Sequence, residues 1–278
     1  SSELISLLIE TRAPKRTLIL GPTYSEYSRE LSFSGSTQDY YHLQEAEDFE
    51  LDVEDLCRTL LNGYDFLILC NPNNPTSSAI LKDEMRALLS FCANRDIFVM
   101  IDETYVEFAP SVQEVTAIPY TKEFSNLMVL RGVSKFYAAP GMRFGYGITG
   151  NKEFLSQMKE KQIPWSLNSL GAYAGEQMFK DTSYIRQTRA LILTERDRMF
   201  LELKKMSSFK VYFPYGNFIL VKILKPEVTS FDVFEACIKE GLMIRDCSSF
   251  QCLDGEFIRF CIMKPEDNNR LLKVLKTI

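Results

Sequence analysis

The stretch F-L-I-L-C-N-P-N-N-P-T, residues 66–76, decides the fold. Its first half, Phe66–Cys70, is a short apolar run, and the asparagines and prolines that follow end it in a turn. This pattern predicts a β-strand with a polar turn at its carboxyl end. Five more apolar runs predict further strands: Thr17–Leu20, Tyr40–Leu43, Phe98–Ile101, Leu127–Leu130 and Phe144–Ile148.

Helical patterns lie between several of these strands. In Asp83–Asn94 the apolar residues Met85, Leu88, Leu89 and Cys92 fall at i, i+3, i+4 and i+7, the spacing of one helix face. Acidic residues open this segment, as the helix dipole favours. Strand and helix therefore alternate, which predicts an α/β domain with a largely parallel sheet.

The second half of the chain has a different order of elements. A helix-rich stretch at residues 170–206 comes first. It is followed by a strand at Phe218–Ile223, a helix at Phe231–Glu240, and strands at Leu242–Arg245 and Phe257–Met263. The last helix has Pro265 in its first turn. This order predicts a smaller α+β domain. We place the boundary near residue 170, with a large domain at residues 1–170 and a small domain at residues 171–278.

Composition and charge exclude several classes of protein. The 278 residues are 46% hydrophobic and 25% charged, which excludes a disordered chain, a collagen-like repeat and a small disulfide scaffold. The net charge of −5 provides no general attraction for nucleic acid or anionic lipid. No apolar run approaches the length of a membrane span. We therefore expect neither nucleic acid nor a membrane as a partner.

Few side chains are available to bind a metal. His42 is the only histidine in the sequence, so few side chains are available for a histidine-based zinc site or a Ser-His-Asp triad. The seven cysteines contain no C-x-x-C pair, and most of them lie in apolar stretches. We expect buried, reduced thiols in a cytoplasmic protein, and no metal site.

Polar side chains follow four of the predicted strands at their carboxyl ends. These strand ends are Gly21–Tyr24, Asn71–Thr76, Asp102–Tyr105 and Arg131–Lys135. They offer an aromatic ring, an amide, a carboxylate, and a lysine together with a serine and an arginine. In open α/β sheets ligands bind outside the carboxyl ends of the strands. The sequence therefore predicts a ligand site at this edge of the sheet.

The motifs at these strand ends resemble a known family. N-P-N-N-P-T at 71–76, D-E-x-Y at 102–105, and S-K at 134–135 followed eight residues later by Arg143 are similar to the fold-type I, pyridoxal-phosphate-dependent aminotransferases. The resemblance runs over essentially the whole chain. Within this superfamily, Pro164–Asn168 resembles the L-threonine-O-3-phosphate decarboxylases, and Arg245-Asp246 is more similar to the histidinol-phosphate aminotransferases.

The resemblance implies an aspartate-aminotransferase-like fold, in which a large domain with a mostly parallel sheet carries a smaller α+β domain. It also implies a homodimer with its site near the subunit interface. The opening Ser1-Ser2-Glu3 leads straight into an apolar helix and resembles the family's phosphate-binding turn with its preceding residues removed. We therefore expect that an N-terminal part is missing from this sequence.

The resemblance assigns the cofactor, pyridoxal 5′-phosphate, to residues at the strand ends. Lys135 would form a Schiff base with the cofactor and later move protons, a role that suits an amine. Asp102 would keep the pyridine nitrogen protonated, so that the ring withdraws electrons from the substrate carbanion in quinonoid chemistry. Tyr105 and Asn74 would hydrogen-bond the ring hydroxyl oxygen.

The same resemblance assigns the cofactor phosphate and the ring face. Ser134 and Arg143 would hold the phosphate, the arginine through a charge-assisted fork. The helix that begins at Ser1 and Ser2 would add backbone N–H groups. Tyr24 would stack on the ring.

Arg259 is a candidate for substrate binding on two grounds. Alternate residues of Phe257–Met263 face opposite ways, which places Arg259 on the same side as Phe257 and Cys261. An arginine inside such a strand is costly unless it is paired. An internal salt bridge would satisfy it. The resemblance instead implies a fork for the substrate carboxylate.

Three further residues are expected at the substrate. Arg245 would bind the substrate's phosphate, or would pair with Asp246 or another acid. Trp165 would line the substrate pocket, or would be a core residue. Asn74 would contact the substrate as well as the cofactor.

The resemblance implies an enzyme that acts on a phosphorylated amino acid or amine. Decarboxylation of L-threonine O-3-phosphate is slightly favoured, and transamination of histidinol phosphate is the alternative. A catalytically inactive ligand-sensing protein with this fold is a second alternative. Gly145–Gly150 fits G-x-G-x-x-G, but no βαβ unit leads into it and no acid ends a following strand. We expect these glycines to allow close packing instead.

Overall fold

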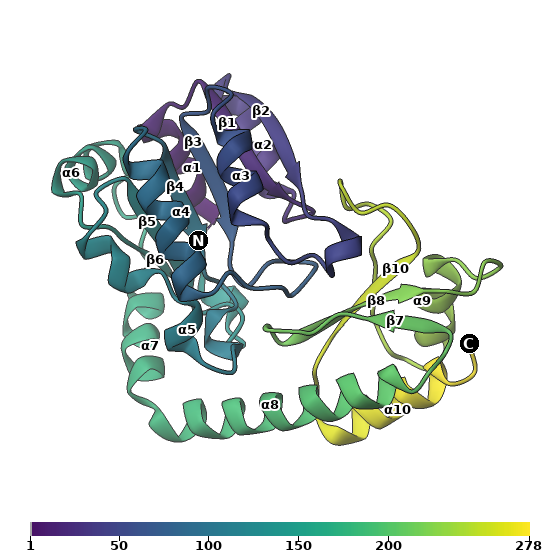
Figure 1. Ribbon diagram of the computed structural model, residues 1–278. Coiled ribbons are helices and arrows are strands. Elements are labelled where there is room, and N and C mark those ends of the chain that lie inside the picture. The colour runs from purple at the N-terminus through teal and green to yellow at the C-terminus, as the bar shows by residue number, and fades with distance from the viewer. Residues whose placement is uncertain (1) are drawn as a thin grey trace.

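The computed structural model describes residues 2–278 and contains two sheets (Figure 1). Ser1, to which a role at the cofactor is assigned above, lies outside the described residues. The first sheet has six strands in the order β2-β1-β3-β4-β5-β6. They are β1 (Arg16–Gly21), β2 (Thr37–His42), β3 (Phe66–Cys70), β4 (Phe98–Asp102), β5 (Leu127–Gly132) and β6 (Gly145–Ile148). All pairs are parallel except β5 with β6, which confirms the predicted, mostly parallel sheet.

Helices cover both faces of this sheet. One face packs against α1 (Ser2–Arg12), α2 (Glu26–Ser34) and α6 (Lys152–Lys161), and the other packs against α3 (Val53–Leu60) and α4 (Lys82–Ala93). The short α5 (Val112–Val115) follows β4. Strand β3 shows why the apolar run at residues 66–70 is unbroken. Phe66 and Ile68 contribute to one core, Leu67 and Leu69 to the other, so no position faces water.

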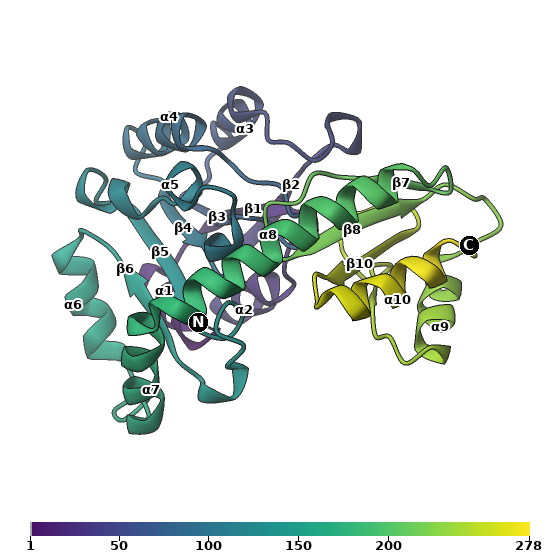
Figure 2. The same ribbon diagram turned by 90° about the horizontal axis from the view of Figure 1, so that it is seen from below.

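The second sheet is antiparallel, with strand order β7-β8-β10-β9. It consists of β7 (Phe209–Val211), β8 (Phe218–Ile223), β9 (Arg245–Asp246) and β10 (Phe257–Cys261). Helices α8 (Thr182–Lys204), α9 (Ser230–Lys239) and α10 (Pro265–Leu275) share its core. The remaining helix, α7 (Ser169–Lys180), precedes α8, which runs from the end of α7 to the second sheet (Figure 2).

Some predicted elements differ from the observed ones. The strand expected at Leu242–Arg245 is β9, Arg245–Asp246, because Leu242 and Ile244 turn into the core before strand pairing begins. The three residues of β7 have no predicted counterpart. The division into domains at residues 170 and 171 stays a prediction; it falls at the start of α7.

Asparagine and aspartate side chains begin the two helices that follow this division. Asn168 Oδ1 accepts a hydrogen bond from the Gly171 N–H at 2.6 Å, and Asp181 Oδ1 accepts one from the Tyr184 N–H at 2.9 Å. Such caps satisfy N–H groups that have no partner inside the helix. They fix where α7 and α8 start.

The glycines of G-Y-G-I-T-G lie in and after the edge strand β6. A Cβ at Gly147 would lie 2.2 Å from Cε of Met128, and one at Gly150 would lie 2.0 Å from the carbonyl oxygen of Thr121. Both positions therefore accept only glycine without a shift of their neighbours. The structure agrees with close packing and not with a dinucleotide-binding turn.

None of the helices within residues 2–278 is long and apolar enough to cross a membrane. In the same residues, no cluster of three or more histidine, cysteine or acidic side chains is arranged to hold a metal ion. All seven cysteines are free thiols.

Candidate active site

A cavity of about 530 Å³ opens at the carboxyl ends of β1, β3, β4 and β5. The parallel pairing brings these ends to one edge, since Cys70 of β3 pairs with Asp102 of β4, and Asp102 pairs with Leu130 of β5. Nine residues expected at the site line the cavity: Ser2, Tyr24, Asn74, Asp102, Tyr105, Ser134, Lys135, Arg143 and Arg259. The edge of the sheet predicted to bind a ligand is therefore the one that carries the cavity.

Asp102 is a buried carboxylate that is held from both sides. The Tyr27 hydroxyl donates to Oδ2 at 2.9 Å, and the N–H and hydroxyl of Thr104 donate to Oδ1 at 2.9 and 2.5 Å. Burial, with the charge of Asp102, raises the pKa of Tyr27 well above its usual value, so this phenol remains a donor. The three donors hold the carboxylate in place at the cavity wall.

Lys135 and Tyr105 lie on neighbouring loops of the cavity wall. The Lys135 side chain is exposed to the open cavity, and its Nζ lies 5.9 Å from the centroid of the Tyr105 ring. Tyr105 is buried and packs edge-on against Phe218 at 4.9 Å. Burial raises the pKa of Tyr105 above its usual value, which keeps the phenol protonated and able to donate.

Cys70 also lines the cavity, although the sequence assigns it no role. Its thiol is buried and contacts the carbonyl oxygen of Pro72 at 3.3 Å. Burial, followed by the nearby charge of Asp102, raises the pKa of Cys70. The thiol is therefore neutral and is not an activated nucleophile.

Arg259 reaches the cavity from the second sheet. Its Nη1 donates to Oδ1 of Asn74, and the guanidinium lies 5.1 Å from the centroid of the Phe218 ring. Its Nε is buried and lacks a hydrogen-bond partner. The internal salt bridge considered from the sequence is not formed within residues 2–278, where Arg259 has no carboxylate partner. A cation with a free donor thus lies between the two sheets.

Ser134 and Arg143 lie where β5 ends and β6 begins. Arg143 has a φ of +50° and closes the turn Pro140–Met142, with its Nη1 donating to the carbonyl oxygen of Pro140 at 2.9 Å. The first described turn of α1, from Ser2 onward, lies at the same cavity. A serine hydroxyl, a guanidinium and a helix N-terminus therefore converge, which is a donor set that suits a phosphate.

A second cavity of about 540 Å³ shares Tyr24, Asn74 and Arg259 with the first. It also contains Arg29 and Arg245. The Arg245 Nη2 donates to the Ser249 hydroxyl at 2.6 Å, and Asp246 instead binds Ser230 and Ser248. The lining residues are Thr23, Tyr24, Ser25, Ser28, Arg29, Tyr40, Asn74, Arg245, Ser249, Phe250, Gln251 and Arg259, so they include three arginines and no acid.

The structure does not bring Trp165 into either cavity. Its side chain is 96% exposed, and the following residues Ser166 and Leu167 line the first cavity instead. Trp165 is therefore not a core residue among residues 2–278, and its place at the substrate stays a prediction. Its φ of +62° turns the chain at this point.

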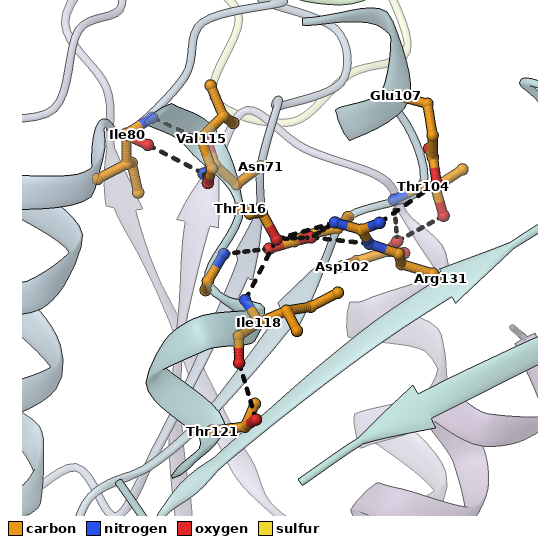
Figure 3. Close-up of polar contacts among 12 residues, drawn as sticks. Asn71, Ile80, Asp102, Thr104, Glu107, Val115, Thr116, Ile118, Thr121 and Arg131 are labelled. Carbon is orange, nitrogen blue, oxygen red and sulfur yellow. Dashed lines mark hydrogen bonds and ion pairs between the residues drawn. The ribbon is translucent and has the colours of Figure 1, made fainter. Parts of the chain in front are cut away.

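A buried charged network lies behind the site (Figure 3). Glu103, which follows Asp102, has its Oε2 2.9 and 2.7 Å from Nε and Nη2 of Arg131 on β5. The Thr116 hydroxyl donates to the same oxygen at 2.8 Å. This network ties the ends of β4 and β5 together. The sequence pattern D-E-x-Y contains Glu103, but a pattern does not show where a side chain points.

Glu107 lies next to this network. One of its oxygens is 3.6 Å from Nη1 of Arg131, and the other is buried without a hydrogen-bond partner. Burial raises the pKa of Glu107 to about 7. Burial also raises the pKa of Glu103, against the opposing effect of Arg131.

Comparisons with known proteins identify the family. The model of aminotransferase class I and II matches residues 1–275. A protein of Caldanaerobacter subterraneus subsp. tengcongensis, provisionally named a threonine-phosphate decarboxylase, is 34% identical over 99% of this chain and 74% of its own length. The threonine-phosphate decarboxylase of Salmonella typhimurium is 30% identical over 95% of this chain and 71% of its own.

A solved structure shows the same fold. The histidinol-phosphate aminotransferase from Clostridium acetobutylicum superposes with a TM-score of 0.92 at 33% sequence identity, covering 99% of this chain and 80% of that one. The aspartate-aminotransferase-like architecture implied by the sequence motifs is thereby confirmed. The chain belongs to the aminotransferase class I and II family of pyridoxal 5′-phosphate-dependent enzymes.

Proposed function

We propose that this enzyme acts on a phosphorylated amino acid or amine, with L-threonine O-3-phosphate as the favoured substrate and decarboxylation as the favoured reaction. The main observation behind this proposal is that Lys135 and Asp102 line the same cavity. The cavity offers a free amine and a buried carboxylate that three donors hold in place. The names of the two decarboxylase relatives support the choice of reaction.

The donor set of the first cavity fits pyridoxal 5′-phosphate. Three cations, Lys135, Arg143 and Arg259, line it beside the single buried carboxylate of Asp102. When bound, the cofactor supplies an aldehyde for a covalent link and a ring that withdraws electrons from the substrate's α-carbon. A buried anion suits a protonated ring nitrogen, because it stabilises that positive charge.

Each side chain then has a distinct task. Lys135 provides the amine for the covalent link and carries a proton to or from the substrate at Nζ. Asp102 would hold the proton on the ring nitrogen. Tyr105 and Asn74 would donate hydrogen bonds to the ring oxygen, and Tyr24 would cover the ring face.

Ser134, Arg143 and the first described turn of α1 would hold the cofactor phosphate. This assignment is supported by the fact that all three line the same cavity. Arg143 is exposed to the cavity and needs only one of its donors for the Pro140 carbonyl, so the remaining donors are available to an anion.

The substrate would span the two cavities. Arg259 lies on their shared wall and would bind the substrate carboxylate. Arg245 and Arg29 line the second cavity and would bind the substrate phosphate; Arg29 also pairs with Glu26 at 2.6 Å. This arrangement favours substrates with two separate anionic groups.

Transamination is the second candidate. The solved structure at TM-score 0.92 is named a histidinol-phosphate aminotransferase, and a phosphate subsite serves that substrate equally well. The two reactions differ in which bond of the α-carbon breaks, which depends on how the bound substrate is oriented. The cavity-lining residues named above are compatible with both.

We further propose a homodimer in the cytoplasm. Large apolar side chains are exposed beside the first cavity: Ile163 (73%), Trp165 (96%), Leu167 (52%), Leu170 (77%) and Tyr173 (67%). A second copy of the chain would cover this face, which gives the exposed Trp165 an apolar environment. Seven free thiols fit a reducing compartment.

Carbon dioxide release from O-phospho-L-threonine, with added pyridoxal phosphate, tests the reaction. We expect release that is abolished in Lys135→Ala and unchanged in Lys159→Ala, a control at an exposed lysine of α6. A protein that links the cofactor at Lys135 but releases no carbon dioxide would exclude decarboxylation of this substrate. Histidinol phosphate with 2-oxoglutarate would then be the next pair to test. A protein that never links the cofactor would favour the ligand-sensing alternative.

A further inference from the structure

One helix contacts both loops that carry Lys135 and Tyr105. Helix α8 packs against the turn Val106–Phe108 and extends to β7 and β8 of the second sheet (Figure 2). In its first turns the Tyr184 hydroxyl donates to the carbonyl oxygen of Phe136 at 2.8 Å. Phe136 directly follows Lys135, so this bond holds the backbone next to the lysine.

Farther along α8, two arginines bind the loop that follows Tyr105. Arg189 donates to the carbonyl oxygens of Glu107, Ala109 (3.0 Å) and Pro110 (3.2 Å). Arg196 donates to the carbonyl oxygen of Phe108 at 3.1 Å. Four consecutive carbonyls, those of residues 107–110, therefore accept hydrogen bonds from α8. They lie at the end of the 3-10 turn Val106–Phe108, where carbonyls lose their helical partners.

These arginines are held in an unfavourable place for a cation. Arg196 is 2% exposed, and burial lowers its pKa and that of Arg189. Hydrogen bonds to carbonyl oxygens only partly offset the free energy that a guanidinium loses when it is removed from water. Apolar side chains in their place would leave the carbonyl oxygens of residues 107–110 without these donors, so the two arginines hold this loop in place.

The same two loops also pack against each other through aromatic rings. Phe136 and Phe108 lie 5.2 Å apart between centroids, and Tyr184 meets Phe136 at 6.1 Å. Tyr105, Phe108 and Phe136 belong to the core that α8 shares with the second sheet. A shift of α8 would therefore move Lys135 and Tyr105 together.

We propose that Tyr184 and Arg189 are positioning residues, which set the Lys135 amine against the Tyr105 ring through the backbone of residues 136 and 107–110. The inference rests on the roles of Lys135 and Tyr105 in the proposed function. Neither Tyr184 nor Arg189 lines either cavity, so they act only through the two loops.

The test uses the cofactor-loaded enzyme and variants with matched controls. Tyr184→Phe removes one hydroxyl and keeps the ring. Tyr120→Phe is its control, because the Tyr120 hydroxyl also donates to a carbonyl at 2.8 Å, that of Lys82, away from the cavity. Arg189→Gln is paired with Arg186→Gln, a control at an exposed arginine of the same helix that donates to the Thr182 carbonyl in its own helix.

Three quantities are measured: the thermal midpoint, kcat and KM for O-phospho-L-threonine, and the pH midpoint of the visible band of Lys135-linked pyridoxal phosphate. Tyr184→Phe and Tyr120→Phe should lower the thermal midpoint equally. Only Tyr184→Phe should lower kcat, by about tenfold, with KM within about twofold. Its pH midpoint should move by about half a unit or more, because proton affinity depends on the distance to neighbouring polar groups.

The outcomes separate this inference from the proposed function. If wild type links the cofactor at Lys135 and Tyr184→Phe matches Tyr120→Phe in kcat and pH midpoint, the inference is overturned and the proposed function stands. If wild type shows no such link, both are overturned. Where O-phospho-L-threonine is not turned over, the pH midpoint alone decides. Because Tyr184→Phe is a mild change, a folding failure of Arg189→Gln leaves the test intact.

Discussion

The phenolic hydroxyl of Tyr27 donates a 2.9 Å hydrogen bond to Oδ2 of Asp102, and both side chains are buried. The tyrosine comes from α2 and the aspartate from the end of β4, so a helix on one face of the sheet supports a carboxylate at its edge. Through this hydrogen bond, the packing of α2 on the large sheet fixes the position of the carboxylate that would contact the cofactor.

Tyr27→Phe should weaken cofactor binding. A hydrogen bond to a charged group contributes about 1.5–3 kcal/mol, which corresponds to a rise in the dissociation constant of roughly tenfold to a hundredfold. Equilibrium titration of the cofactor-free protein with pyridoxal phosphate measures this. Tyr64→Phe is the control, because the Tyr64 hydroxyl also binds an aspartate, Asp39 at 3.0 Å, outside both cavities. Equal affinities in the two variants would contradict a role for Tyr27 at the site.

Arg131→Met should destabilise the fold strongly. Arg131 is half-buried and Glu103 fully buried, so the change leaves a carboxylate without its cation. Removing one partner of a buried pair costs about 3–5 kcal/mol in the free energy of unfolding. Arg86→Met breaks the exposed pair with Glu123 and should cost about 1 kcal/mol or less. Urea unfolding of both variants compares them, and a small loss in Arg131→Met would show that the pair is not structural.

Glu107 should make the stability of the protein depend on pH. Its pKa is raised from 4.5 to about 7 in the folded state because it is buried. The folded state therefore holds this proton more tightly, and its contribution to stability is present below pH 4.5 and is lost as pH rises through about 7. The loss is at most about 3 kcal/mol. Glu107→Gln should show a smaller fall in thermal midpoint between acidic and alkaline pH, and an identical fall would refute this assignment.

Arg259→Lys should impair substrate binding and leave the cofactor link intact. Lysine keeps the charge but cannot form the two-pronged contact that a guanidinium makes with a carboxylate. We expect kcat/KM to fall by about a hundredfold, with the visible band of the linked cofactor retained. Arg95→Lys, at an arginine that covers the ring of Phe91, serves as the control. Loss of the band in Arg259→Lys would place this arginine at the cofactor instead.

The first sheet and most of the cavity could be predicted from the sequence because their signals are local. The run Phe66–Cys70 is a strand of the same bounds in the structure. The polar strand ends converge because parallel strands have a common direction. Alternation in β10 also holds, since Phe257 and Ile258 belong to different cores.

The residues that support the site could not be predicted because their roles depend on contacts distant in sequence. Tyr27 lies 75 positions from Asp102 and reads as an ordinary core residue of an amphipathic helix. Arg131 and Glu103 are separated by 28 positions. For Trp165 the sequence left a pocket position and a core position open, and the exposed side chain excludes only the core position.

The most direct test of the account is to map the covalent attachment of pyridoxal phosphate. The protein is mixed with the cofactor, reduced with borohydride, digested and analysed by mass spectrometry. We expect one stoichiometric label, on Lys135, which is lost in Lys135→Ala with no new label elsewhere. A label on another lysine, or an unlabelled Lys135 in folded protein, would contradict it.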